Sequence, residues 1–155
     1  MARFDYWKQF IKDQSLINTG QSRHILYSLD ANDIAEAEKR IGFEFPKELN
    51  VFYTEIGYGF LCKDDNSMID RIMDPFSVAD FRLKQGIYET DENVDLFSSK
   101  NQFVFFEVNE DSFIHLDLSK HDNNGVHPIY YFDLKIADSL QEFLEKMDQR
   151  TDYYL

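Results

Sequence analysis

Three histidines are the first residues in this chain that could carry chemistry. His115, His121 and His127 lie near Asp117 and Asp122, and these side chains are the types that bind metal ions. A metal site needs its donors to converge about 2 Å from the ion, but these spacings match no ligand motif. We therefore interpret the group as a coincidence of strand-face and turn residues, and we expect no metal and no cofactor.

The single cysteine is the other obvious candidate for chemistry. A nucleophile must be held beside a base that is itself oriented. Cys62 directly follows Phe60-Leu61, which predicts a small buried hydrophobic residue and not a reactive thiolate. His24 stands alone in a connector and is expected at the surface or half-buried. The chain has no G-x-S-x-G, no phosphate loop and no G-x-G-x-x-G, and six glycines leave little material for a nucleotide cradle.

Adjacent carboxylates form a third group. Asp64-Asp65, Asp91-Glu92 and Glu110-Asp111 could act as acid and base if they were buried opposite another carboxylate. All three pairs fall in predicted turns or loops, where solvated side chains are the rule. We predict that the protein is not an enzyme. The same carboxylates could instead form an acidic rim around the aromatic residues of an open sheet face, a surface that suits a basic protein partner.

The charge of the chain limits its partners. There are 29 Asp and Glu residues against 16 Lys and Arg residues, which gives a net charge of −13 and a pI near 4.6. Such a chain repels nucleic acid and anionic membranes, because both are bound through Lys and Arg. Two interpretations stay open at this point. The charge can serve solubility alone, or it can attract a basic partner and accelerate its association.

The elements that position these residues are clearest near the middle of the chain. An apolar face at residues 34–41 predicts a helix, and Gly42 ends it. Pro46 begins a second helix, whose stripe at 49–56 is apolar at i, i+3, i+4 and i+7 and which closes at Gly57. This stretch is scaffold and contains no reacting group.

The remaining elements follow from periodicity and turn signals. Ser77 and Asp80 predict a cap for a third helix that stops at Gly86, and Ser139 with Glu142 predicts a capping box for the last helix. Other expected elements are an opening helix that includes Phe4 and ends before Asn18, extended pieces at 25–27 and 60–61, a turn at 63–67 and a loop at 88–100. Strands are expected at 103–106 and 112–118, joined by a hairpin turn at 109–111, and at 129–132. Alternation in the second of these strands predicts one sheet face under helices and one face partly open.

Composition completes the fold class. Hydrophobic residues make up 43% and aromatic residues 16% of the chain, which indicates an ordered globule. The apolar runs are too short to span a bilayer, and there is no apolar leader. One cysteine fits a reducing compartment, so we expect a cytoplasmic protein. We predict a single α+β domain over 1–155, with a mostly antiparallel sheet packed with helices from the N-terminal half and a C-terminal helix.

The central stretch also resembles a known family. Its motif is a glutamate-bearing helix, a Gly-aromatic-x-aromatic/Leu-Pro corner, a second helix ending in Gly-x-Gly and a hydrophobic strand. Here these elements read Glu38, Gly42-Phe43-Glu44-Phe45-Pro46, Leu49 to Ile56, Gly57-Tyr58-Gly59 and Phe60-Leu61. The pattern resembles the SUKH superfamily, a domain shared by a yeast cell-wall assembly regulator and many bacterial immunity proteins. Phe45 departs from the usual Leu before the proline.

The resemblance implies an immunity protein. Bacterial members are typically encoded beside polymorphic toxins and neutralise them by binding, so the implied partner is a cognate toxin with a basic surface. The negative charge further predicts that this toxin is a nuclease and that the protein neutralises it by covering its surface, without catalysis. The alternative is a regulatory or scaffolding interaction domain. No motif residue marks the interface, so on charge and expected exposure alone we predict Asp64, Asp65, Asp91, Glu92, Asp95, Glu110, Asp111, Asp117 and Asp122.

Overall fold

The computed structural model describes residues 3–12, 23–62 and 68–155. Four α-helices and three 3₁₀ helices alternate with eight strands in this part of the chain. The helices are η1 (Asp5–Phe10), α1 (Ala31–Ile41), α2 (Lys47–Glu55), α3 (Pro75–Leu83), η2 (Gly86–Tyr88), η3 (Glu92–Phe97) and α4 (Leu140–Gln149). The strands are β1 (Ile11–Lys12), β2 (Ile25–Tyr27), β3 (Tyr58–Phe60), β4 (Arg71–Ile72), β5 (Gln102–Asn109), β6 (Ser112–Asp117), β7 (Ile129–Tyr131) and β8 (Leu134–Ala137).

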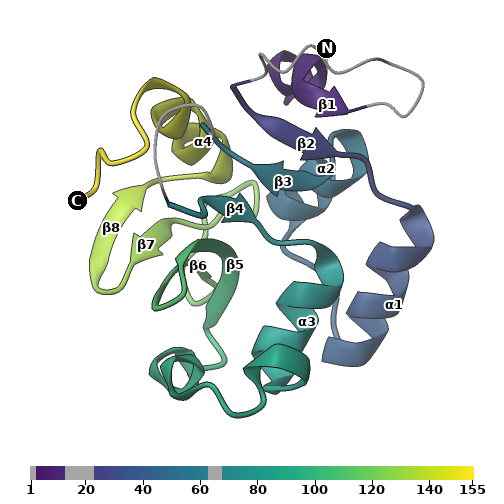
Figure 1. The fold of residues 1–155 in the computed structure, drawn as a ribbon, viewed down its shortest axis with the longest axis vertical. Coiled ribbons are helices and arrows are strands. Elements are labelled where there is room, and N and C mark those ends of the chain that lie inside the picture. The colour runs from purple at the N-terminus through teal and green to yellow at the C-terminus, as the bar shows by residue number, and fades with distance from the viewer. Residues whose placement is uncertain (1–2, 13–22, 63–67) are drawn as a thin grey trace.

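The eight strands form one sheet in the order in which they occur along the chain. β1 and β2 are parallel, and each later neighbouring pair is antiparallel. The predicted α+β class with a mostly antiparallel sheet is therefore confirmed. In Figure 1 the sheet runs from β1 at the top to the β7–β8 hairpin at the left, so the two ends of the chain's strand series lie far apart.

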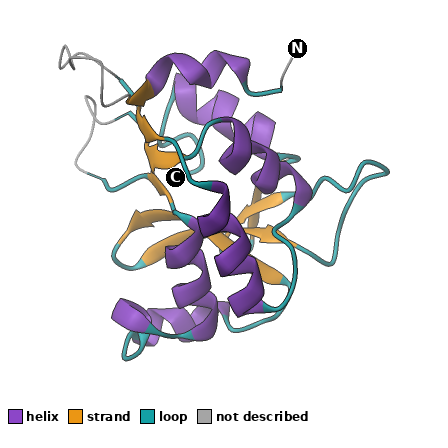
Figure 2. Cartoon of the chain, turned by 90° about the vertical axis from the view of Figure 1, so that its right-hand side faces the viewer, coloured by secondary structure: helices purple, strands orange, loops and turns teal. Residues whose placement is uncertain are grey.

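Helices cover both faces of the central strands. α1 and α3 lie side by side at the right of Figure 1 and stand in front of the strands in Figure 2. Phe81 of α3 packs on Phe113 of β6, with ring centroids 4.7 Å apart, whereas Phe143 of α4 packs on Phe106 of β5 at 5.2 Å. Phe106 pairs with Ile114, whose side chain points away from that of Phe113. The expectation of a partly open sheet face therefore fails over β6, since Phe113 is completely buried. It holds toward the β7–β8 hairpin, where Tyr130 is half-buried and its neighbour Lys135 is exposed.

The helix boundaries follow local capping chemistry. Asp30 caps α1 by accepting from the Asn32 amide at 2.8 Å, and Gly42 ends that helix in the left-handed region at φ 89°. Ser139 caps α4 through the Glu142 amide, as predicted. The predicted Ser77 cap of α3 is wrong: the helix begins three residues earlier, because Asp74 caps it and Pro75 occupies its first position.

Two parts of the C-terminal half differ from expectation. The segment predicted as a loop at 88–100 contains η3, whose Val94 and Phe97 are buried. The second difference is β8, a strand that the sequence did not reveal. Only two residues, Phe132 and Asp133, separate the paired Tyr131 and Leu134, and neither is the Asn or Gly that marks a tight hairpin. The sequence of the β7–β8 hairpin therefore gives no clear sign that one strand ends and a second begins.

Candidate functional site

Five of the predicted interface carboxylates lie at one end of the β5–β6 pair. Two of them lie in η3, Asp91 caps η3, and the β5–β6 turn carries the other two. The side-chain amide of Asn93 ties the segments together by donating to Asp111 Oδ1 at 3.0 Å. We call this set the acidic surface: it consists of Asp91, Glu92, Asp95, Glu110 and Asp111. Four of the five are exposed, and Asp91 is half-buried because it caps η3 through the Asn93 backbone amide. The acidic surface therefore comes from two segments that are separated in the sequence.

The other predicted carboxylates do not join it. Asp117 lies at the opposite end of β6, paired with Gln102. Burial alone would raise its pKa, but hydrogen bonds from the hydroxyl and amide of Ser119 outweigh this and hold the pKa below its usual value. The pKa of Asp122 is lowered by backbone amides, first that of Val126. These two carboxylates hold turns, and the structure does not bring them together with the other five. Asp64 and Asp65 lie outside the described residues, as does the predicted turn at 63–67.

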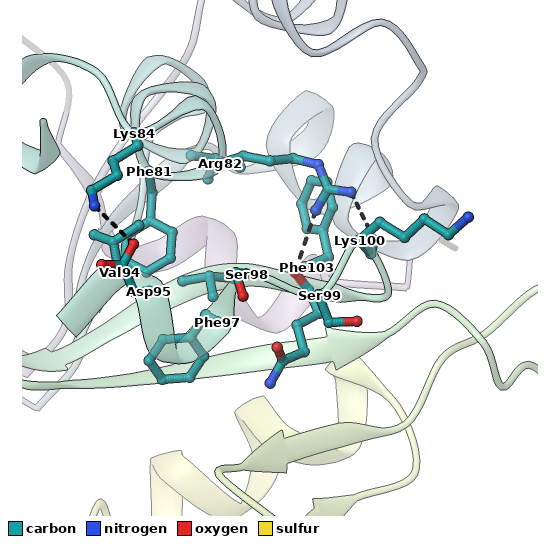
Figure 3. A pocket seen from close by; sticks show the side chains of 13 residues that line it. Phe81, Arg82, Lys84, Val94, Asp95, Phe97, Ser98, Ser99, Lys100 and Phe103 are labelled. Carbon is teal, nitrogen blue, oxygen red and sulfur yellow. Dashed lines mark hydrogen bonds and ion pairs between the residues drawn. The ribbon is translucent and has the colours of Figure 1, made fainter. Parts of the chain in front are cut away.

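A pocket of about 260 Å³ lies beside the acidic surface, between α3 and the segment from η3 to β5 (Figure 3). Arg82 extends across it, stacked on the rings of Phe43 and Phe103 at 5.0 and 5.4 Å. Its guanidinium donates to the carbonyl oxygens of Lys100 and Gln102 at 2.7 and 3.3 Å. Within the described part of the chain Arg82 meets no carboxylate, and burial lowers its pKa. The pocket has an apolar floor and a charged rim, which suits binding and supplies no oriented nucleophile.

Sequence reasoning missed the neighbouring β7–β8 turn. The ring of Phe132 contacts that of Phe97 in η3, with centroids 5.7 Å apart, so the turn lies against the element that carries most of the acidic surface. Asp133 is exposed and close enough to raise the pKa of His115. Leu96, which precedes Phe97, is 62% exposed. The local signal for this turn is weak, because Asp133 is the one turn-forming residue in it and Phe132 continues the apolar run of the preceding strand.

A Cys-His-Asp arrangement occurs in the core, but it is not a catalytic one. His24 Nε2 lies 2.6 Å from Asp148 Oδ1, and His24 Nδ1 lies 3.9 Å from Cys62 Sγ. The same Nδ1 accepts the Cys62 backbone N–H at 3.0 Å, so its lone pair is unavailable to deprotonate the thiol. Cys62 is completely buried, as predicted. His24 is also completely buried, which contradicts its expected surface or half-buried position.

The three other histidines do not converge. His115 is buried in β6, stacked on Tyr130, whereas the rings of His121 and His127 are 6.2 Å apart in the loop after β6. No group of three or more metal-binding side chains is present among residues 3–12, 23–62 and 68–155. Within the same residues, no helix has the length and apolar character required to cross a membrane.

Comparison with known proteins decides the family. The SUKH family model described as SMI1-KNR4 cell-wall matches residues 31–144, which is most of the chain. The chain belongs to the SUKH family. It is also 37% identical over 131 residues to the "Immunity protein YxxD" of Bacillus subtilis (strain 168), covering 83% of this chain and 86% of the relative. No solved structure matches it.

Two glutamates of this SUKH domain hold its elements together. Glu38 Oε2 accepts the Phe45 amide at 2.8 Å and the Asn50 side-chain amide at 3.2 Å, which fixes the corner between α1 and α2. Glu48 accepts the backbone amides of Leu140 and Gln141 at 2.6 and 3.0 Å and so caps α4 from α2. The motif region therefore stabilises the fold and supplies no residue of the acidic surface.

Proposed function

We propose that this SUKH protein is an immunity protein that binds a cognate toxin in the cytoplasm and neutralises it by non-catalytic occlusion. The observation that carries the proposal is the 37% identity, over most of both chains, to a relative named an immunity protein. The acidic surface supports the same function, because it gathers exposed carboxylates from η3 and the β5–β6 turn onto one end of the sheet.

The charge points to the class of toxin. A nuclease grips its substrate through a basic surface, since binding depends on neutralising phosphates with Lys and Arg. A protein with net charge −13 can cover such a surface by presenting carboxylates in place of phosphates. We therefore propose a nuclease toxin with a basic surface, encoded beside this chain, and no catalysis by the immunity protein itself.

The proposal is tested with the toxin encoded next to this chain. Its C-terminal domain is expressed in cells with and without this protein, growth is followed, and the complex is recovered by a pull-down. We expect growth arrest without this protein, rescue with it, and a stable complex. Nuclease activity of the purified domain on DNA and RNA should fall in proportion to the immunity protein added. A neighbour that neither arrests growth nor binds would contradict the proposal.

A second candidate function is a regulatory or scaffolding interaction, which the cell-wall description of the matching family model favours. It predicts a cellular partner and no effect on toxin-dependent growth arrest. The growth assay separates the two functions, because only the immunity protein rescues cells that express the toxin.

A further inference from the structure

The β7–β8 turn holds an aromatic residue where the backbone favours Asn or Gly. Phe132 has φ 53°, in the left-handed region, and occupies the first position of a two-residue hairpin loop. Both common types of such loops need positive φ at that position, which a bulky side chain adopts only when its surroundings impose it. The other non-glycine residues with positive φ among the described residues are Cys62, Asp70 and Lys84. Phe132 is the one large hydrophobic residue of this set that is exposed.

Exposed apolar side chains gather around this turn. Phe132 is 39% exposed and Leu134, on the far side of the turn, is 54% exposed. The ring contact between Phe132 and Phe97 joins the turn to η3, where Leu96 is exposed beside Phe97. We call Leu96, Phe132 and Leu134 the Phe132 patch. Exposed apolar patches of this kind mark interaction sites more often than isolated exposed hydrophobic residues do.

A buried polar atom without a partner lies beneath the patch. His115 is 4% exposed, its ring packs against Phe97 at 6.0 Å, and it stacks on Tyr130. Its Nδ1 has no hydrogen-bond partner in the described structure. Folding alone favours neither an unpaired buried nitrogen nor a phenylalanine with positive φ. His115 and Phe132 both pack on the ring of Phe97, which ties the two features to one place in the fold.

Carboxylates lie next to the patch and point to the chemistry of its partner. Asp133 is in the same turn, and Glu92 and Asp95 are on η3 close to Leu96, although Asp95 is paired with Lys84 at 2.8 Å and Lys135 follows Leu134. Nucleic acid and anionic membranes would be repelled by this arrangement. A protein surface with an apolar hollow inside a ring of Lys and Arg residues would match it, since interfaces place aromatic anchors at the centre and charges at the rim.

We propose that the Phe132 patch is the hydrophobic anchor that docks into the basic surface of the toxin, with the acidic surface steering the approach. This proposal rests on the proposed immunity function. The backbone strain at Phe132 is retained because the turn must present an aromatic ring to the partner. Binding energy is concentrated in the patch, and the carboxylates contribute mainly to the association rate.

The test replaces Phe132 with a residue that suits the turn. Phe132→Asn removes the ring and relaxes the backbone, since Asn adopts positive φ more readily. We expect its Tm to stay within about 3 °C of the wild type or to rise, while affinity for a catalytically inactive toxin domain falls by at least about tenfold. Leu96→Ala should weaken binding as well and leave the Tm nearly unchanged, because Leu96 is largely exposed.

Tyr27→Ala is the matched control. Tyr27 is 38% exposed, nearly the same as Phe132, but it lies on β2, five strands away in the sheet. Its replacement should leave toxin affinity unchanged. Affinity is measured by isothermal titration calorimetry, and the oligomeric state of the free protein by light scattering.

The outcomes separate this proposal from the proposed function. If the wild-type protein neither binds nor neutralises the toxin, the proposed function fails. If the wild type binds and both Phe132→Asn and Leu96→Ala bind equally well, the anchor is wrong and the immunity function stands. A free protein that is a dimer, and that Phe132→Asn converts to a monomer, would also overturn the anchor, because a second copy of this chain would then cover the patch.

Discussion

Single carboxylates in this protein differ sharply in what they do. Glu48 is buried and accepts two backbone amides at the start of α4 as well as a hydrogen bond from Arg3 at 3.0 Å. Glu145, which lies on α4 itself, is exposed. A buried carboxylate that satisfies helix N-terminal amides gives stability through charge-assisted hydrogen bonds. An exposed carboxylate at the surface contributes solvation and little else.

We predict that Glu48→Gln lowers the free energy of unfolding by about 1.5–3 kcal/mol, because an amide oxygen replaces a carboxylate that accepts several bonds. Glu145→Gln is the control, and its effect should stay within about 0.5 kcal/mol. Urea denaturation followed by circular dichroism measures both values. Equal effects of the two substitutions would show that Glu48 does not stabilise α4.

His115 gives the protein a pH dependence with a defined sign. Burial lowers its pKa from the ordinary value of 6.5, while Asp117 and Asp133 act in the opposite direction. Below about pH 6.5 His115 therefore binds a proton more readily in the unfolded state than in the folded state, so the free energy of unfolding falls as pH drops below that value. Above about pH 6.5 the histidine is neutral in both states and this loss of stability is absent.

We predict that His115→Phe makes the free energy of unfolding less dependent on pH between about pH 7 and about pH 5. Phenylalanine keeps the aromatic contacts with Phe97 and Tyr130 but cannot titrate. Denaturant titrations at a series of pH values provide the comparison. Parallel curves for the wild type and the variant would show that His115 titrates alike in the folded and unfolded states.

At the scale of elements, the β2–β3 pair depends on the glycines that follow α2. Gly59 has φ 145° and pairs with Leu26, and a Cβ built on it would lie 2.2 Å from the carbonyl oxygen of Ile25. The backbone of β2 cannot move away from this Cβ without breaking the hydrogen bonds between β2 and β3. Gly125 also has positive φ, at 75°, but a Cβ on it would meet nothing within 4 Å. The two positions share unfavourable dihedral angles and differ in crowding.

We predict that Gly59→Ala destabilises the protein by about 3 kcal/mol or more, since strain and a backbone clash add. Gly125→Ala should cost about 1 kcal/mol, from the dihedral angle alone. Thermal and urea unfolding of both variants give the values. If the two losses were similar, positive φ and not close approach would be the reason for glycine at position 59.

At the scale of the whole molecule, the net charge of −13 creates a long-range field, and the acidic surface concentrates part of it at one end of the sheet. Such a field accelerates association with a basic partner and is screened by salt. Contacts of the Phe132 patch act at short range and are screened little. The two surfaces should therefore affect different rate constants.

We predict that the association rate constant with the toxin falls by about tenfold or more between about 20 mM and about 500 mM salt, while the dissociation rate constant changes much less. The double variant Glu92→Gln, Asp111→Asn, which removes two charges from the acidic surface, should reduce the dependence of the association rate constant on salt. Glu145→Gln, on the helix that covers the opposite sheet face, should leave that dependence unchanged. Stopped-flow fluorescence measures the rates, and a dissociation rate that carries the whole effect of salt would contradict electrostatic steering.

Features that arise from contacts between near neighbours in the chain could be predicted from the sequence. The cap at Ser139, the left-handed end at Gly42 and the β5–β6 hairpin all depend on residues within a few positions of one another, so spacing and residue type were sufficient. The net charge was equally accessible, because it is a sum over residues. The family motif indicated the α1–α2 corner for the same local reason.

Contacts between residues distant in the chain became visible only in the folded structure. Glu48 contacts the start of α4, His24 contacts Asp148, and η3 contacts both the β5–β6 and β7–β8 turns. Carboxylates that look equivalent in the sequence were thereby divided into an acidic surface and turn-forming residues such as Asp117. These pairings depend on how the helices and the sheet pack, which residue spacing alone does not encode, because the free energy of packing is shared among many side chains from separate elements.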